Sequence, residues 1–366
     1  MTPNTGRNIV VLCDGTSNQF AQDRTSVAKL AYALVKDPAR QAVYYHPGIG
    51  TKAPPGFPMP VGNLLARGAG LAVAYGLQDD IRDAYLFIMN NWRPGDQLYL
   101  FGFSRGAYTA RVVAALVYMY GMAMAGNDPL ILYAVDMLWK LHGVPQAELN
   151  AAFNLAKQFK LSLGAAPCHP HFVGVWDTVS SVGWFGSPVS IPGATTNPDI
   201  VTFRHAISID ERRAFFRPNK FNPGPGQDVK QVWFPGDHCD VGGGHKEAES
   251  GMSKYPLEWM AKEAMVVGLL VDPGRLDEIL GKAPSQLPGI AFAEAEPTAK
   301  LHDSMAWYWR PAEFVPKPHW DAKTRTRSLR ANLFARRDMG VSPLVHPVAW
   351  QIPSYSACLP PGATPA

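Results

Sequence analysis

Short apolar segments alternate with longer amphipathic segments along most of this chain. Apolar runs that end at polar or glycine-rich turns predict strands at residues 8–12, 42–45, 98–101, 171–176 and 230–234. Apolar residues at helical spacing predict helices at residues 25–35, 77–91, 112–126, 127–163, 257–267 and 273–280, and a helix that begins within 205–213. Strands and helices that alternate with short connections indicate an α/β fold, with a mostly parallel central sheet covered by helices on both faces.

One of these strands runs directly into the sequence Gly102-Phe103-Ser104-Arg105-Gly106, which is followed by a helix-compatible segment. This is the G-x-S-x-G pattern, in which a sharp strand-to-helix turn exposes a serine hydroxyl. The two glycines suit a turn in which the strand and helix backbones lie too close for side chains. Ser104 is therefore the candidate nucleophile, and a glycine-rich turn with an incidental serine is the alternative.

Two later strands end in side chains that could complete a hydrolase triad. Asp177 follows the strand at residues 171–176, and His238 follows the strand at residues 230–234. The chain order Ser, Asp, His is that of α/β-hydrolases. In such a triad His238 takes the proton of Ser104 and later returns it to the leaving alcohol, while Asp177 fixes the histidine tautomer.

Other roles stay open for these two loops. Asp177 could cap a turn. His346 is the alternative catalytic base, because the histidine of most α/β-hydrolases lies near the C-terminus. The loop around His238 could instead form an anion-binding glycine nest, or a metal site from His238, Cys239, Asp240 and His245. The spacing of these four residues fits no standard metal motif, so neither a metal nor a cofactor is predicted.

The pattern also offers candidates for the backbone groups that would stabilise a developing oxyanion. The N–H of Arg105 lies at the first helical turn after the serine and would supply one donor. A second would come from Gly15 or Thr16, in the loop at the carboxyl end of the first strand. Asp14 belongs to the same loop, where a single acid is expected to cap the turn.

Composition adds few constraints. The chain has 366 residues, of which 47% are apolar and 17% charged, as in a globular protein with a sizeable core. Its formal net charge is +4, and basic residues gather at 317–337, where they could face phospholipid headgroups or form the solvated surface of a helix. Basic and aromatic residues do not interleave on a recognisable module, so nucleic-acid binding is not expected.

Three further features bear on the compartment. The four cysteines show no CxxC spacing and predict no disulfide framework. The N-terminal residues enter a strand almost at once, which leaves no room for a signal peptide. The longest uncharged apolar run, residues 112–126, is shorter than the roughly 18 to 20 residues of a membrane span. We therefore expect the protein in the cytoplasm of the cell that produces it.

Six segments together are similar to a known family. They are CDGTSN, GFSRGAYTAR, VGVWDTV, AISIDERR, WFPGDHCDVGGGH and PLEWMAKEA, spread from Cys13 to Ala264. The set resembles the α/β-hydrolase family that includes phospholipase effectors of bacterial type VI secretion systems. The family's catalytic serine, aspartate and histidine fall on Ser104, Asp177 and His238.

The resemblance implies esterase chemistry on glycerophospholipids, with release of fatty acid. The chain departs from the family's pattern at Asp237, where a carboxylate beside His238 could compete for its proton. We expect a serine hydrolase of lipid carboxylic esters, of phospholipase A type, that works through an acyl-enzyme. A small-ester or polyester hydrolase and a non-catalytic binding member of the fold are the alternatives.

The same resemblance sets expectations for partners and organisation. The expected partners are a lipid or phospholipid ester, a membrane surface, an immunity protein and a secretion apparatus that exports the chain. We expect a single α/β-hydrolase domain over residues 1–366. Within it, 127–165 and 180–200 are predicted as cap or lid insertions, and 267–366 as a C-terminal extension packed on the core.

Overall fold

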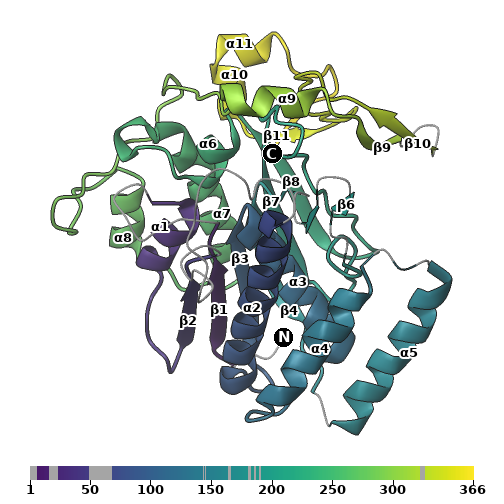
Figure 1. Cartoon of the computed structure of the whole chain (residues 1–366). Helices are drawn as coiled ribbons and strands as arrows, with labels where there is room; N and C mark the ends of the chain where they lie inside the picture. Colours follow the sequence, from purple (N-terminus) through teal and green to yellow (C-terminus); the bar gives the residue numbers. More distant parts are fainter. Residues whose placement is uncertain are drawn as a thin grey trace.

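An eight-stranded parallel sheet forms the centre of the computed structural model (Figure 1). The structure describes residues 6–15, 24–48, 68–142, 144, 146–163, 166–179, 183–184, 187–188, 191–321 and 326–366. The strand order is β12-β11-β8-β7-β4-β3-β1-β2, and neighbouring strands pair in parallel. The strands are β1 (Asn8–Cys13), β2 (Gln41–His46), β3 (Gln97–Phe103), β4 (Pro170–Trp176), β7 (Thr202–Ser208), β8 (Asp228–Phe234), β11 (Leu344–Val345) and β12 (Thr364–Pro365). The predicted fold class is confirmed.

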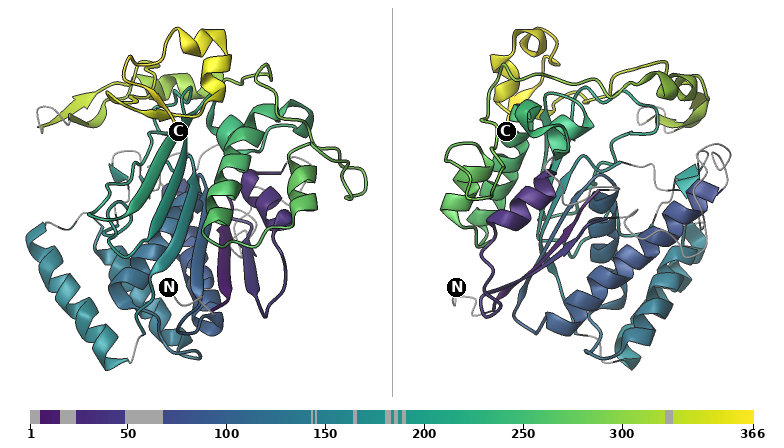
Figure 2. Two further views of the ribbon diagram at one scale, coloured as in Figure 1. Left: turned by 180° about the vertical axis from the view of Figure 1, so that it is seen from behind. Right: turned by 60° about the vertical axis from the view of Figure 1, so that its left-hand side comes forward.

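Helices cover both faces of this sheet (Figures 1 and 2). Ile9 and Val11 of β1 belong to one core cluster, and the alternate residues Val10 and Leu12 belong to another. This period of two is what a strand buried on both faces requires. The first cluster includes buried residues of α2 (Gly68–Asn91), α3 (Arg105–Tyr120) and α4 (Asp128–Lys140). The second includes buried residues of α1 (Ser26–Ala33), α7 (Lys254–Val266) and α8 (Pro273–Ile279).

Two helices among the described residues of 127–165 lie on the side of the sheet that α2 and α3 cover. Helix α4 contacts α2 and α3, and α5 (Gln146–Ser162) contacts α3. Both lie toward the end of the molecule away from α6 (His238–Gly242) in the views of Figures 1 and 2. The predicted lid at 180–200 falls partly outside the described residues, and β5 (Gly183–Trp184) and β6 (Ser187–Pro188) within it form a short antiparallel pair. Their roles as caps or lids stay predictions.

The chain from His302 onward, called the C-terminal part below, lies across the end of the sheet at which α6 begins (Figures 1 and 2). It adds β11 beside β8 and β12 at the edge of the sheet. Its other elements are η3 (Trp307–Trp309), α9 (Arg310–Glu313), β9 (Lys317–Asp321), β10 (Thr326–Arg330), α10 (Val348–Gln351) and α11 (Pro353–Ser356). Two short 3-10 helices, η1 (Glu247–Glu249) and η2 (Gly251–Ser253), lie earlier in the chain, just before α7. No helix in the described part of the chain has both the length and the apolar character needed to cross a membrane.

Three local expectations were wrong. The helix expected to begin within 205–213 is the strand β7, whose seven residues are all buried. A strand buried on both faces lacks the polar alternation that marks a half-exposed strand, and the charged residues that follow it suggested a helix surface. Within the basic stretch 317–337, residues 317–321 and 326–330 form the antiparallel pair β9 and β10 rather than a helix. The loop that carries His238 contains the short helix α6.

We predict that Phe101→Ala will lower the free energy of unfolding by about 3 to 5 kcal/mol. Phe101 lies in β3 with no exposed surface, and its ring is 5.4 Å from that of Phe172 and 6.3 Å from that of Trp176. Urea unfolding of both proteins measures the difference. Leu161→Ala is the control, because its side chain is 76% exposed and should change stability by no more than about 0.5 kcal/mol. Equal effects at the two sites would contradict the packing described.

Candidate active site

Ser104 lies at a tight turn between β3 and α3. Its backbone has φ 57° and ψ −119°, an unusual conformation for a residue other than glycine. A Cβ atom on Gly102 would lie 2.3 Å from the carbonyl oxygen of Gly106, and one on Gly106 would lie 2.1 Å from that of Cys13. Only glycine fits at these two positions, so the turn holds the serine in its strained conformation. This is the elbow predicted from the sequence.

The structure brings the three predicted triad residues together. The His238 Nε2 atom lies 2.8 Å from Ser104 Oγ, and the Nδ1 atom lies 2.5 Å from Asp177 Oδ2. Asp177 follows β4 and His238 begins α6, just after β8. Since β3 and β4 are neighbours and β8 lies beyond β7, all three side chains meet at the carboxyl edge of the sheet. This arrangement allows a proton to pass from the hydroxyl to the imidazole.

His238 is held from two sides. The ring of Phe103 lies 4.7 Å from its imidazole and the ring of Phe216 lies 5.0 Å from it.

Asp237 does not compete for the proton of His238, contrary to the concern raised by the sequence. The Asp237 carboxylate instead accepts the N–H groups of Cys239 and Asp240, each at 2.9 Å, as the N-cap of α6.

Asp177 is fully buried and paired with Arg337. Arg337 Nη1 lies 2.5 Å from Oδ1 and Nη2 lies 3.1 Å from Oδ2, while the N–H of Ser208 donates to Oδ1 at 3.0 Å. Burial alone would raise the pKa of Asp177, but Arg337 and His238 together hold this pKa well below its usual range. The carboxylate therefore stays ionised and can orient the imidazole.

Sequence reasoning missed Arg337. It lies 160 residues after Asp177 and appeared only as one of many basic residues in 317–337. Its guanidinium also donates to the carbonyl oxygens of Ser208 and Phe216. No local motif could have identified it, because its role depends on where the C-terminal part folds back.

The expected oxyanion donors are only partly in place. Arg105 N–H is in the first turn of α3, where backbone donors have no partner within the helix. Gly15 N–H donates to Asp14 Oδ1 at 2.7 Å, so Gly15 would have to give up this bond to serve as a donor. Asp14 also accepts from Thr25 and Tyr45, as expected for an acid that organises its loop. Thr16 lies outside the described residues.

His346, the alternative base, is placed elsewhere. Its ring stacks on Phe234 at 4.8 Å, and its Nδ1 atom accepts the N–H of Val348 at 3.3 Å. Burial lowers the pKa of His346 to about 4. The structure therefore brings His238, and not His346, to Ser104.

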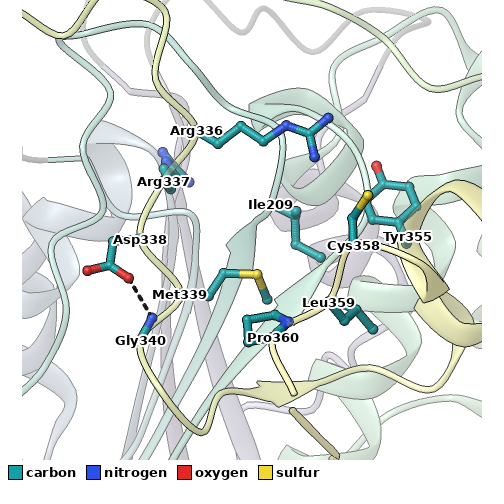
Figure 3. A pocket seen from close by; sticks show the side chains of 10 residues that line it. All are labelled: Ile209, Arg336, Arg337, Asp338, Met339, Gly340, Tyr355, Cys358, Leu359 and Pro360. Carbon is teal, nitrogen blue, oxygen red and sulfur yellow. Dashed lines mark hydrogen bonds between the residues drawn. The ribbon is translucent and has the colours of Figure 1, made fainter. Parts of the chain in front are cut away.

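A pocket of about 200 Å³ is bordered by Arg337 and residues of the C-terminal part (Figure 3). It is lined by Ile209, Arg336, Arg337, Asp338, Met339, Gly340, Tyr355, Cys358, Leu359 and Pro360. Arg337 borders this pocket and also binds Asp177. Because Ser104 and His238 do not line it, we assign this pocket no part in binding the ester.

The parallel sheet, with a serine in a strand-to-helix elbow at its carboxyl edge, defines an α/β-hydrolase fold. Residues 7–263 match the family described as T6SS, Phospholipase effector Tle1-like, catalytic domain. The chain therefore belongs to the Tle1-like phospholipase effector family, and the resemblance inferred from the sequence is confirmed.

Three individual proteins similar to this chain differ in how much of each chain the similarity covers. An uncharacterized protein of Saccharomyces cerevisiae (strain ATCC 204508 / S288c), YEL023C, is 34% identical over 237 residues, which make up 60% of this chain and 33% of the yeast protein. An uncharacterized protein from Pseudomonas aeruginosa has a TM-score of 0.43 and 20% identity, covering 73% of this chain and 46% of that one. The Tle1 effector bound to the VgrG spike of the type 6 secretion system has a TM-score of 0.37 and 16% identity, covering 75% of this chain and 62% of that one. The chain thus spans about a third of the yeast relative.

We predict that Asp177 makes folding sensitive to acid. Because its pKa is depressed on folding, its stabilisation is present above the unfolded pKa of about 3.9 and is lost as the pH falls toward the folded value. The difference in free energy of unfolding between wild type and Asp177→Asn should therefore shrink by up to about 1.4 kcal/mol per pH unit below about pH 4. Urea unfolding across this range measures it. A difference that does not change with pH would contradict the depressed pKa.

We predict that Arg337→Met will lower kcat by roughly 10²-fold with little change in KM, because a displaced Asp177 misorients His238 while Ser104 is untouched. Arg337→Lys should recover only part of the rate, since an ammonium cannot bind both carboxylate oxygens as a guanidinium does. Steady-state kinetics on a soluble ester tests both. Arg336→Met, at the exposed neighbouring position, is the matched control and should behave as wild type. Equal losses at 336 and 337 would show that Arg337 has no specific role.

Proposed function

We propose that this protein is a serine esterase that hydrolyses carboxylic ester bonds of phospholipids, as a phospholipase of A type. The hydrogen-bonded series Asp177, His238 and Ser104 at the elbow is the observation that carries the proposal. Membership of the Tle1-like phospholipase effector family supports the lipid substrate. It also supports the predicted secretion-apparatus partner, while the immunity protein and the membrane surface stay predictions.

The proposed reaction follows from the positions of these atoms. His238 Nε2 accepts the hydroxyl proton of Ser104 as the oxygen attacks the ester carbonyl carbon. The imidazolium that forms is stabilised by Asp177, which stays ionised beside Arg337. The imidazolium then protonates the leaving lysophospholipid alcohol, which leaves the acyl group on Ser104. A water molecule, deprotonated by His238, releases the fatty acid and regenerates the serine.

The assembled triad also bears on the alternatives. A binding protein that had lost catalysis would have no need to keep a strained serine, a buried imidazole and a paired carboxylate in hydrogen-bond contact. A small-ester or polyester hydrolase would use the same chemistry, so substrate choice separates it from a phospholipase. Phospholipid vesicles and short p-nitrophenyl esters compared on the same enzyme make that distinction.

We predict that wild type releases fatty acid from phosphatidylglycerol or phosphatidylethanolamine vesicles. Ser104→Ala and His238→Ala should each lose on the order of 10⁴-fold or more in kcat, because each removes a group that makes or breaks bonds. His346→Ala should keep the activity of its folded fraction, since His346 does not reach Ser104.

Two controls make this test decisive. Ser354→Ala changes an exposed serine and should leave the rate unchanged. A fluorophosphonate probe should label wild type but not Ser104→Ala, which reports the activated serine even if the vesicles are a poor substrate. Full activity of Ser104→Ala on any ester would refute the proposed nucleophile. Labelling without vesicle hydrolysis, together with fast turnover of short esters, would refute the phospholipid substrate alone.

A further inference from the structure

Two histidines and an aspartate gather on the side of α6 that faces the C-terminal part. Asp240 belongs to α6, His245 follows this helix, and His302 comes from the segment before η3. One ligand atom of each residue lies within 4.8 Å of those of the other two. The rings of His245 and His302 are stacked, with centroids 3.7 Å apart and planes 20° apart. A nitrogen atom of each ring lies within 4 Å of Asp240 Oδ1.

The contacts of His302 point to a cation. Its Nδ1 atom lies 2.7 Å from Asp240 Oδ1, and its Nε2 atom lies 3.0 Å from Glu249 Oε2. A neutral imidazole carries one N–H, whereas ionised carboxylates only accept. The 2.7 Å between Nδ1 and Oδ1 is a hydrogen-bond distance, and it would widen to about 3.4 Å with a tetrahedral metal ion bound to both atoms. In metal sites the ligating histidine commonly donates its other N–H to a carboxylate, which is the position that Glu249 holds.

The second histidine approaches the same carboxylates. His245 Nε2 lies 3.0 Å from Asp237 Oδ1 and 3.9 Å from Asp240 Oδ1. Both aspartates are buried, at 1% exposure. Within the described part of the chain, the two imidazoles are the basic side chains in direct contact with them. A divalent cation would balance this excess of negative charge.

We propose that Asp240, His245 and His302 bind one divalent transition-metal ion of the Zn²⁺ class, with Glu249 as the outer partner of His302. Bonds of about 2.0 to 2.2 Å in a tetrahedral site place ligand atoms roughly 3.4 Å apart, between the 2.7 and 3.9 Å seen from Asp240 Oδ1. Imidazole ligands favour Zn²⁺ over Ca²⁺ or Mg²⁺. His245 and His302 are partly exposed, so water can occupy the fourth position.

This proposed metal site differs from the alternative considered from the sequence, which comprised His238, Cys239, Asp240 and His245. It also departs from the expectation that the protein binds no metal. Asp240 and His245 belong to both sets. His238 is instead held between Ser104 and Asp177. The third ligand, His302, lies 62 residues after Asp240 and had no local signal. The ion would fix the C-terminal part to the helix that begins at His238, which makes it a structural site rather than a participant in ester cleavage.

The test is a Zn²⁺ titration of metal-free full-length protein, followed by equilibrium dialysis with elemental analysis and by thermal unfolding. Wild type should retain about one Zn²⁺ per chain and unfold at a higher temperature when Zn²⁺ is present. His245→Ala and His302→Ala should each lose more than 10-fold in Zn²⁺ affinity, and Glu249→Gln should lose roughly 10- to 100-fold. Co²⁺ in place of Zn²⁺ should give visible absorption bands in wild type that the histidine variants lack.

His169→Ala is the matched control, because the His169 side chain is 59% exposed and lies just before β4, outside this cluster. It should bind Zn²⁺ as wild type does. Circular dichroism and fluorophosphonate labelling of Ser104 without metal establish that the His245 and His302 variants are folded. Failure of wild type to bind Zn²⁺ at micromolar concentration, or equal binding by wild type and both histidine variants, would overturn the proposal. In the first case an additional proton, rather than a metal, joins His302 to Asp240.

Discussion

A buried carboxylate that must remain charged is the constraint on which this site depends. Asp177 has no exposed surface, and an unpaired charge in such a place would cost several kcal/mol or would be neutralised by protonation. Arg337 prevents both by binding the two carboxylate oxygens. Without this pairing Asp177 could not stabilise a charged imidazolium on His238, so the chemistry proposed at Ser104 depends on a residue far along the chain.

The sheet supplies the rest of the geometry through close packing. Parallel strands place their carboxyl ends at one edge, which is why side chains that follow β3, β4 and β8 can meet. The elbow sets the position of Ser104 because Gly106 brings α3 against the backbone of β1. Phe103, the residue just before the serine, packs on the imidazole of His238. The end of β3 therefore positions the proposed nucleophile and supports the proposed base.

The parts of this arrangement with local signals could be predicted from the sequence. Buried strands that end in polar turns, and the G-x-S-x-G elbow, each depend on neighbouring residues. The sheet could therefore be predicted, and so could the three residues Ser104, Asp177 and His238 that the structure brings into contact. The strand β7 was mistaken for a helix because burial on both faces removes alternation. Arg337 and His302 were missed for another reason. Each acts only through a contact with a residue 160 or 62 positions away, and single-sequence patterns carry no information on such pairs.

The C-terminal part is consequently a component of the candidate active site rather than an accessory to it. The family match ends at residue 263 and contains the whole proposed triad, yet Arg337, which binds Asp177, lies beyond it. So do Ser304, which donates to the N-cap residue Asp237, and His302, which contacts Asp240 on the same helix. One later segment therefore supports both Asp177 and His238. Arg337 binds Asp177, and residues 302–304 contact the helix that begins at His238. Because the later segment reaches both Asp177 and the helix of His238, a change in its packing would alter the acid and the base together.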